Sequence, residues 1–230
     1  MKELLLNSAY FGVVISLIGY EVGLLMRKVF KKSFINPLLI AIVFVMIAIS
    51  LLGVDYKAYN NSAKYISYLL TPATVCLAVP LYEQFELLKK NYKAVLAGIF
   101  SGVIASLFSV FLLCLLFGLS HEQYVTLLPK SITTAIGMGV SEELGGVVTV
   151  TVASIIVTGI LGNVLAELVF KLFRIKHPVA RGLSLGTASH AIGTSRAMEL
   201  GQAEGAMSSL AIAVAGLMTV VLAPVFAQFI

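Results

Sequence analysis

The chain has 230 residues, of which 59% are apolar and 12% are charged, and its mean hydropathy is +1.00. Soluble domains average about 45–50% apolar and 25% charged residues, so this composition indicates a membrane protein that crosses the bilayer several times. The net charge of +5 does not indicate nucleic-acid binding, because the basic residues form short runs between apolar segments, where they orient the chain in the membrane. Cys76 and Cys114 lie inside apolar runs and predict neither a disulfide nor a metal site.

Eight apolar segments follow one another, each of roughly the 20 residues that a helix needs to cross the hydrocarbon core. They cover residues 4–26, 36–53, 64–88, 93–118, 125–144, 146–171, 180–200 and 205–229. The first segment is too long for the apolar region of a signal peptide and lacks a small-residue cleavage site, so we expect it to remain in the protein. The basic run Arg27–Lys32 that follows is expected to stay in the cytoplasm, which places the N-terminus outside.

Segment 125–144 differs from the others because Pro129, Lys130 and Glu142 interrupt its apolar residues. If it crossed the membrane, the basic run Lys171–Arg181 would lie outside, against the tendency of lysine and arginine to remain inside. We therefore expect 125–144 to be a re-entrant or broken element that lines a cavity. The predicted fold is an all-α polytopic membrane protein with about seven crossings and one re-entrant element, in a single transmembrane domain, 1–230.

An offset of 115 residues aligns part of the first half of the chain with part of the second. The aligned pairs are Leu70 with Leu185, Ala73 with Ala188, Thr74 with Ser189, and Leu77 with Ile192. Under the charge-based topology the two segments run in opposite directions, so we predict inverted half-repeats at about 1–118 and 119–230. Interrupted helices at corresponding positions of inverted repeats are typical of transporter binding sites.

Both aligned segments contain residues that interrupt helices, namely Pro72 in the first and Gly186 and Gly193 in the second. A helix that restarts inside the membrane presents free N–H groups, which bind anions together with the helix dipole. We therefore predict a binding site for a small carboxylate near mid-membrane, where two half-helix N-termini meet. The candidate substrate-binding residues are Thr71, Thr74, Thr187, Ser189, His190, Thr194 and Arg196.

Each candidate also has an ordinary structural interpretation. The hydroxyls fit helix capping or hydrogen bonds between helices. His190 is either a buried, hydrogen-bonded imidazole or a substrate contact or proton carrier. Arg196 either makes a forked contact with a carboxylate or pairs with Glu199, one helical turn away. Helix packing is the expected role of Asn163, Gly98 and Gly102.

The sequence offers little support for catalysis. It contains no His-Glu-x-x-His, phosphate-binding-loop or paired-aspartate motif. Ser189 and His190 are adjacent, so on a helix their side chains point apart and do not form a nucleophile–base pair. We expect no enzymatic activity, no cofactor and no metal.

Three stretches of the chain resemble the LrgB/CidB family of bacterial membrane proteins. They are LLTPATVCLAVPLYEQ at 69–84, PKSITTAIGM at 129–138, and GTASHAIGTSRAMELG followed by EGAMSSLA, which together span 186–211. The same stretches resemble the C-terminal membrane domain of the plant plastidic glycolate/glycerate translocator. The bacterial resemblance implies a holin- or antiholin-like regulator of murein hydrolase activity and lysis with a small LrgA/CidA-like partner. The plant resemblance implies movement of small hydroxycarboxylates.

Two functions from different classes therefore remain open. The first is a secondary transporter of small monocarboxylates of the pyruvate, glycolate and glycerate class, which explains the interrupted segments and Arg196. The alternative is a holin/antiholin-like regulator of murein hydrolase activity and cell lysis, which predicts an oligomeric interface. In both cases we expect a multi-pass protein of the bacterial cytoplasmic membrane that forms a homo-oligomer and binds no nucleic acid.

Overall fold

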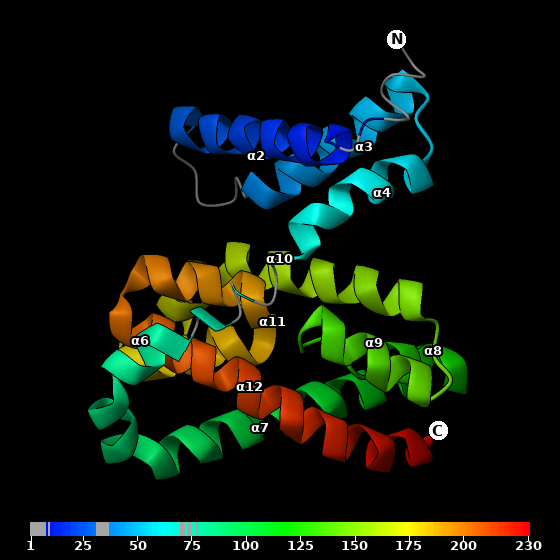
Figure 1. Cartoon of the computed structure of the whole chain (residues 1–230). Helices are drawn as coiled ribbons and strands as arrows, with labels where there is room; N and C mark the ends of the chain where they lie inside the picture. Colours follow the sequence, from blue (N-terminus) through cyan, green and yellow to red (C-terminus); the bar gives the residue numbers. More distant parts are fainter. Residues whose placement is uncertain (1–7, 9, 31–36, 70–71, 73–74, 77) are drawn as a thin grey trace. The chain divides into compact units, whose positions relative to one another are not determined.

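The fold is built from helices (Figure 1). The computed structural model describes residues 8, 10–30, 37–69, 72, 75–76 and 78–230, and these contain no β-strand. Three of the described helices are long and apolar enough to cross a membrane: Lys89–Phe117, Val148–Leu172 and Gln202–Phe229. A shorter apolar helix covers Pro37–Leu52. The prediction of an all-α membrane protein is confirmed at this level.

The described chain separates into two compact units, Met1–Cys76 and Leu77–Ile230. In the first unit, α2 (Phe11–Phe30) packs against α3 (Pro37–Leu52) and α4 (Tyr56–Ser67). Glycines on α2 permit this close approach, since a Cβ at Gly23 would lie 2.4 Å from the Pro37 carbonyl oxygen. The helix extends past the predicted end at 26 and carries the first basic residues in its last turn.

The second unit contains the longest helices and the candidate site. Its elements are α6 (Ala78–Glu83), α7 (Phe85–Phe117), α8 (His121–Leu127), α9 (Thr134–Glu143), α10 (Val148–Leu172), α11 (Pro178–Leu200), α12 (Gln202–Phe226) and η1 (Ala227–Phe229). Helices α11 and α12 pack closely side by side, because Cβ atoms at Gly182 and Gly186 would each lie 2.4 Å from a carbonyl oxygen of α12. Small residues on α11 therefore decide how tightly this pair packs.

Helix α7 begins earlier than the sequence predicts. The basic residues at 89–93 were expected to form a linker between crossings, but they lie within the first turns of α7. Its 33 residues extend for about 50 Å, which exceeds the roughly 30 Å hydrocarbon core. A helix of this length can cross the hydrocarbon core with its lysines in the polar region, so the basic residues do not require a loop.

Segment 125–144 is broken, as predicted. Helices α8 and α9 are separated by a turn at 128–133, and buried hydroxyls hold the element together. The Thr151 hydroxyl lies 2.7 Å from the Ser141 hydroxyl oxygen and 2.8 Å from the Thr126 carbonyl oxygen. The Thr126 hydroxyl oxygen in turn accepts a hydrogen bond from the backbone N–H of Val147, at 2.8 Å. These contacts tie α8, α9 and the start of α10 to one another.

The predicted repeat depends on residues that the structure does not describe. Leu70, Thr71, Ala73, Thr74 and Leu77 all lie outside the described residues. The 115-residue offset and the inverted half-repeats therefore stay predictions.

Candidate functional site

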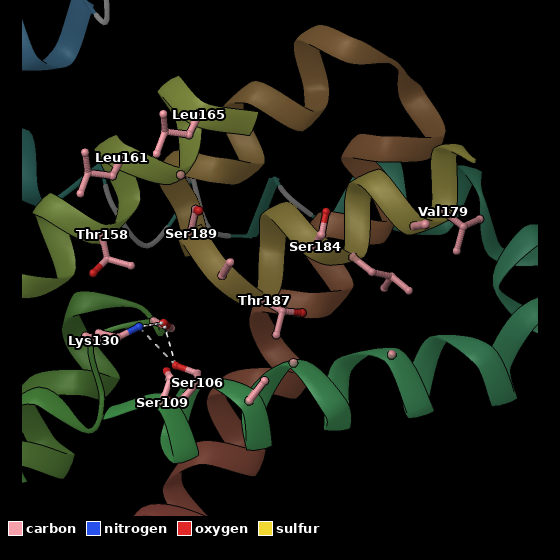
Figure 2. A pocket seen from close by; sticks show the side chains of 18 of the residues that line it. Ser106, Ser109, Lys130, Thr158, Leu161, Leu165, Val179, Ser184, Thr187 and Ser189 are labelled. Carbon is pink, nitrogen blue, oxygen red and sulfur yellow. Dashed lines mark hydrogen bonds between the residues drawn. The ribbon is translucent and has the colours of Figure 1, made fainter. Parts of the chain in front are cut away.

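A cavity of about 960 Å³ lies in the unit Leu77–Ile230. It is bounded by α7, α10, α11 and the turn between α8 and α9 (Figure 2). The described residues that line it include Lys130 and His177 but no aspartate, glutamate or arginine. Most of the others are small or carry hydroxyls, so the cavity combines an apolar wall with a few hydrogen-bond donors, as small-molecule sites commonly do.

One face of α7 forms a long wall of the cavity. The lining residues of this helix recur every three or four positions from Asn91 to Ser109, so they share one face. The distance along the helix between these two residues is about 27 Å, close to the thickness of the hydrocarbon core. Gly98 and Gly102 add no side chain to this wall. The packing role expected for Gly102 is confirmed, since a Cβ there would lie 2.7 Å from Thr187 Cγ2, whereas a Cβ at Gly98 would lie 3.4 Å from Leu183 Cδ1, an ordinary contact.

Lys130 supplies the positive charge in the cavity. It lies on the α8–α9 turn, and its ammonium donates to the hydroxyl oxygens of Ser131, at 3.1 Å, and Ser106, at 3.5 Å (Figure 2). Ser106 itself donates to the Ser131 hydroxyl oxygen at 3.0 Å. Among the described residues no carboxylate pairs with Lys130, because the ion pairs of this unit join other residues. A half-buried ammonium whose partners are neutral hydroxyls keeps most of its attraction for an anion.

Thr187 brings a second unsatisfied group to the same region. Its side chain is 7% exposed, and its hydroxyl has no hydrogen-bond partner. Thr187, Ser106 and Ser131 also line an adjoining cavity of about 10 Å³, but the Thr187 oxygen points away from Lys130 in Figure 2. A buried hydroxyl without a partner costs about 1–3 kcal/mol relative to a bonded one. Ser189, another predicted candidate, lines the large cavity and packs against Gly162 of α10.

His190 interrupts α11. Its backbone angles, φ 41° and ψ −134°, are not helical, and a positive φ is costly for a residue with a side chain. The interruption was predicted at Gly186 and Gly193, but the structure has it between them. Gly193 is needed because of the break, since the chain folds back so that a Cβ there would lie 2.5 Å from the Leu185 carbonyl oxygen. Gly186 instead permits close packing against Ser208 of α12.

The His190 imidazole is buried under α10 and does not line the cavity. Its Nε2 lies 2.9 Å from the carbonyl oxygen of Ile155, and a Cβ at Gly159 would lie 2.8 Å from the ring. Thr194, one turn later, donates to the His190 carbonyl oxygen at 3.0 Å and contacts the Ser208 hydroxyl at 2.7 Å. Both residues therefore make the hydrogen bonds of a buried structural network, and the binding roles predicted for them stay predictions.

Arg196 forms ion pairs at the second half of α11. Its guanidinium contacts Glu199 in the same helix and Glu167 of α10. The interpretation that pairs it with Glu199 is confirmed, and Glu167 is a further partner that sequence spacing did not indicate. Nearby, the Asn163 amide donates to the Ile192 carbonyl oxygen at 3.0 Å, which confirms the expected contact between helices. Arg196 does not line the cavity, so its contact with a substrate remains a prediction.

The structure thus brings only part of the predicted set to one place. Thr187 and Ser189 line the cavity, His190, Thr194 and Arg196 lie in the α11 network beside it, and Thr71 and Thr74 lie outside the described residues. Lys130 and Ser106 were not among the predicted binding residues. The signal for Lys130 was present as a lysine directly after a proline in a weakly apolar segment.

Comparison with known proteins relates the chain to one group of membrane proteins. A model of the LrgB-like family matches residues 16–229. The antiholin-like protein LrgB of Bacillus cereus (strain B4264) is 40% identical over 222 residues, with 96% of both chains covered. The antiholin-like protein LrgB of Bacillus anthracis (strain A0248) matches with the same identity and coverage. No solved structure matches the chain.

Proposed function

We propose that this chain, which belongs to the LrgB-like family, is an antiholin-like regulator of murein hydrolase activity and cell lysis. The observation that carries this proposal is the 40% identity, over 96% of the chain, to proteins named antiholin-like. In this proposal the chain lies in the bacterial cytoplasmic membrane with about seven crossings and 125–144 as a re-entrant element. It assembles as a homo-oligomer and acts with a small LrgA/CidA-like membrane partner.

Lysis control can be tested by complementation. In a Bacillus cereus strain that lacks its own LrgB-like protein, expression of this chain should restore the wild-type rate of detergent-induced lysis, followed as loss of turbidity. The matched control is the same strain with an empty vector. Membrane expression without any change in the lysis rate would contradict the proposal.

A second candidate function is the secondary transport of small monocarboxylates. The observation that favours it is the ammonium of Lys130 in a cavity whose described lining carries no acidic residue. A regulator that acts through protein contacts alone does not need such a group, whereas a site for a carboxylate does. Export of a metabolite that affects the cell wall would also connect transport to lysis control.

Transport can be tested with purified protein in liposomes. We expect uptake of at least one of pyruvate, lactate, glycolate and glycerate above the rate of protein-free liposomes. The exchange of labelled for unlabelled acid across the same membrane measures binding and movement without a driving gradient. Absence of both uptake and exchange for all four acids would rule out this second function.

A further inference from the structure

We propose that Lys130 and Ser131 form the site that binds the carboxylate group of a small organic monoanion. The inference rests on the transport function proposed above and goes further by assigning the site to residues of the α8–α9 turn. It differs from the site predicted from sequence, which relied on half-helix N-termini and Arg196.

Two hydrogen-bond donors remain available at this place. The Lys130 ammonium has three N–H groups and uses them on two serine oxygens, at 3.1 Å and 3.5 Å, so the longer contact is weak and one N–H is left. Ser131 accepts from Lys130 and from Ser106, which leaves its own O–H to donate. The Thr187 hydroxyl also has no partner, but it is buried and points away from Lys130 in Figure 2, so it is not part of this site. A carboxylate carries two oxygens with about four acceptor positions and can satisfy both donors.

The charge at the site fits a ligand with one carboxylate. Lys130 is not neutralised by any described carboxylate, and the other ionisable residue in the cavity lining is His177, at the start of α11. Figure 2 shows Lys130 with Ser106 and Ser109 at one end of the view and Val179, near the start of α11, toward the other end. Among the residues that the structure describes, one fixed cation therefore faces the ligand at the Lys130 end, so a second carboxylate would remain without a partner there.

The space also limits where the carboxylate lies. The adjoining cavity shared by Ser106, Ser131 and Thr187 has a volume of about 10 Å³. That is close to the lower limit for one water and too small for a carboxylate. The ligand must therefore approach from the cavity of about 960 Å³, whose wall on α7 is formed by glycine, alanine and serine.

A structural role for the same residues makes a different prediction for stability. If the contacts of Lys130 with Ser106 and Ser131 mainly held the turn in place, removal of the ammonium would lower the melting temperature of the ligand-free protein. If Lys130 is kept for an anion, the ligand-free protein is left with an uncompensated charge, so Lys130→Met should melt at an equal or higher temperature. The same substitution should abolish the rise in melting temperature that a bound carboxylate produces.

The test uses the full chain in detergent and in liposomes, with sodium pyruvate, lactate, glycolate and glycerate as probes and sodium chloride at equal ionic strength as the control. We expect Lys130→Gln to weaken binding by about 10- to 100-fold, the range typical of a lost hydrogen bond from a charged group. Lys130→Arg should retain part of the affinity. Lys89→Gln is the matched control, because the Lys89 side chain is 61% exposed and pairs with Glu86 on the surface of α7.

Ser131 provides an independent variant. Ser131→Ala removes the hydroxyl that donates to the carboxylate, so it should weaken binding even if Lys130 substitutions impair folding. Thr187→Val is the matched control, because it removes a hydroxyl that points away from Lys130 in Figure 2 and keeps the methyl that contacts Gly102, so it should bind nearly as the wild type does.

The outcomes separate this inference from the transport proposal. Stabilisation by one of the acids that depends on Lys130 and Ser131, without uptake, would contradict transport and support the site. Uptake with an unchanged KM in Lys130→Gln and Ser131→Ala would support transport and overturn the site. Equal stabilisation by sodium chloride, or no stabilisation and no uptake with any acid, would also overturn it.

Discussion

Gly102 of α7 faces Thr187 of α11 so closely that a Cβ at residue 102 would lie 2.7 Å from Thr187 Cγ2. This contact positions both the wall of the cavity and the one buried side-chain hydroxyl, among the described residues, that has no hydrogen-bond partner. The threonine side chain is short and β-branched, so its methyl has little freedom to move aside. The distance between α7 and α11 therefore depends on the absence of a side chain at residue 102.

We predict that Gly102→Ala separates α7 from α11 and lowers the stability by about 1–3 kcal/mol, as overpacking does. Gly139→Ala in α9 is the matched control, because no heavy atom lies within 4 Å of a Cβ there. The control should be neutral or stabilise by up to about 1 kcal/mol through helix propensity. Thermal unfolding in detergent measures both, and equal melting temperatures for the two variants would contradict the prediction.

Arg196 allows a test between ion pairing and ligand binding. Because its guanidinium contacts both Glu167 and Glu199, Arg196→Ala leaves two carboxylates without this partner and should destabilise the protein by about 1–3 kcal/mol, less than for a fully buried pair. Arg196→Lys keeps the charge, so it should retain wild-type affinity if the residue only pairs with these carboxylates. A loss of carboxylate affinity of tenfold or more in Arg196→Lys, measured by uptake, would instead support the forked contact predicted from sequence.

His190 is the predicted proton carrier of the chain. An imidazole can exchange a proton near neutral pH, whereas an amide that occupies the same place can only hydrogen-bond. We predict that His190→Gln leaves substrate exchange measurable but abolishes accumulation driven by a pH gradient. The measurement compares both in the same liposomes, with His121→Gln as the control because His121 is exposed and contacts the C-terminal Ile230. Accumulation that survives in His190→Gln excludes it as the carrier.

The orientation of the chain can be tested by labelling. The basic runs predict that residues 28–32, 89–93 and 171–176 face the cytoplasm. Single cysteines at Asn91 and Lys176, introduced after Cys76 and Cys114 are replaced by serine, should react with an impermeant thiol reagent only in inside-out vesicles. Reaction in intact cells at either position would refute the charge-based topology and, with it, the inverted half-repeats.

The sequence by itself determined the class of the protein and the approximate positions of the long apolar helices α7, α10 and α12, whereas the predicted segment 64–88 is divided between α4 and α6. Long apolar runs separated by basic residues have few alternatives to membrane helices, because unsatisfied backbone groups are too costly in lipid. The sequence also predicted the break in 125–144, since Pro129 and Lys130 are incompatible with a continuous helix that crosses the membrane. The sequence predicted that α11 would be interrupted, but it did not predict that the non-helical residue would be His190. His190 holds a positive φ because its ring is fixed by Ile155 and Gly159 of another helix.

Only the tertiary structure decided which groups from distant helices contact the cations Arg196 and Lys130. In the sequence Arg196 has one possible partner at helical spacing, Glu199, and its second partner was not predicted. Arg196 meets Glu167, 29 residues earlier in the chain, whereas Lys130 meets the hydroxyls of Ser106 and Ser131. Which side chains face a cation depends on how distant helices pack, and local composition carries no information about that. The packing of α7 and α11 through Gly102 and Thr187 thus left Lys130 as the cation available to an anion in the described cavity.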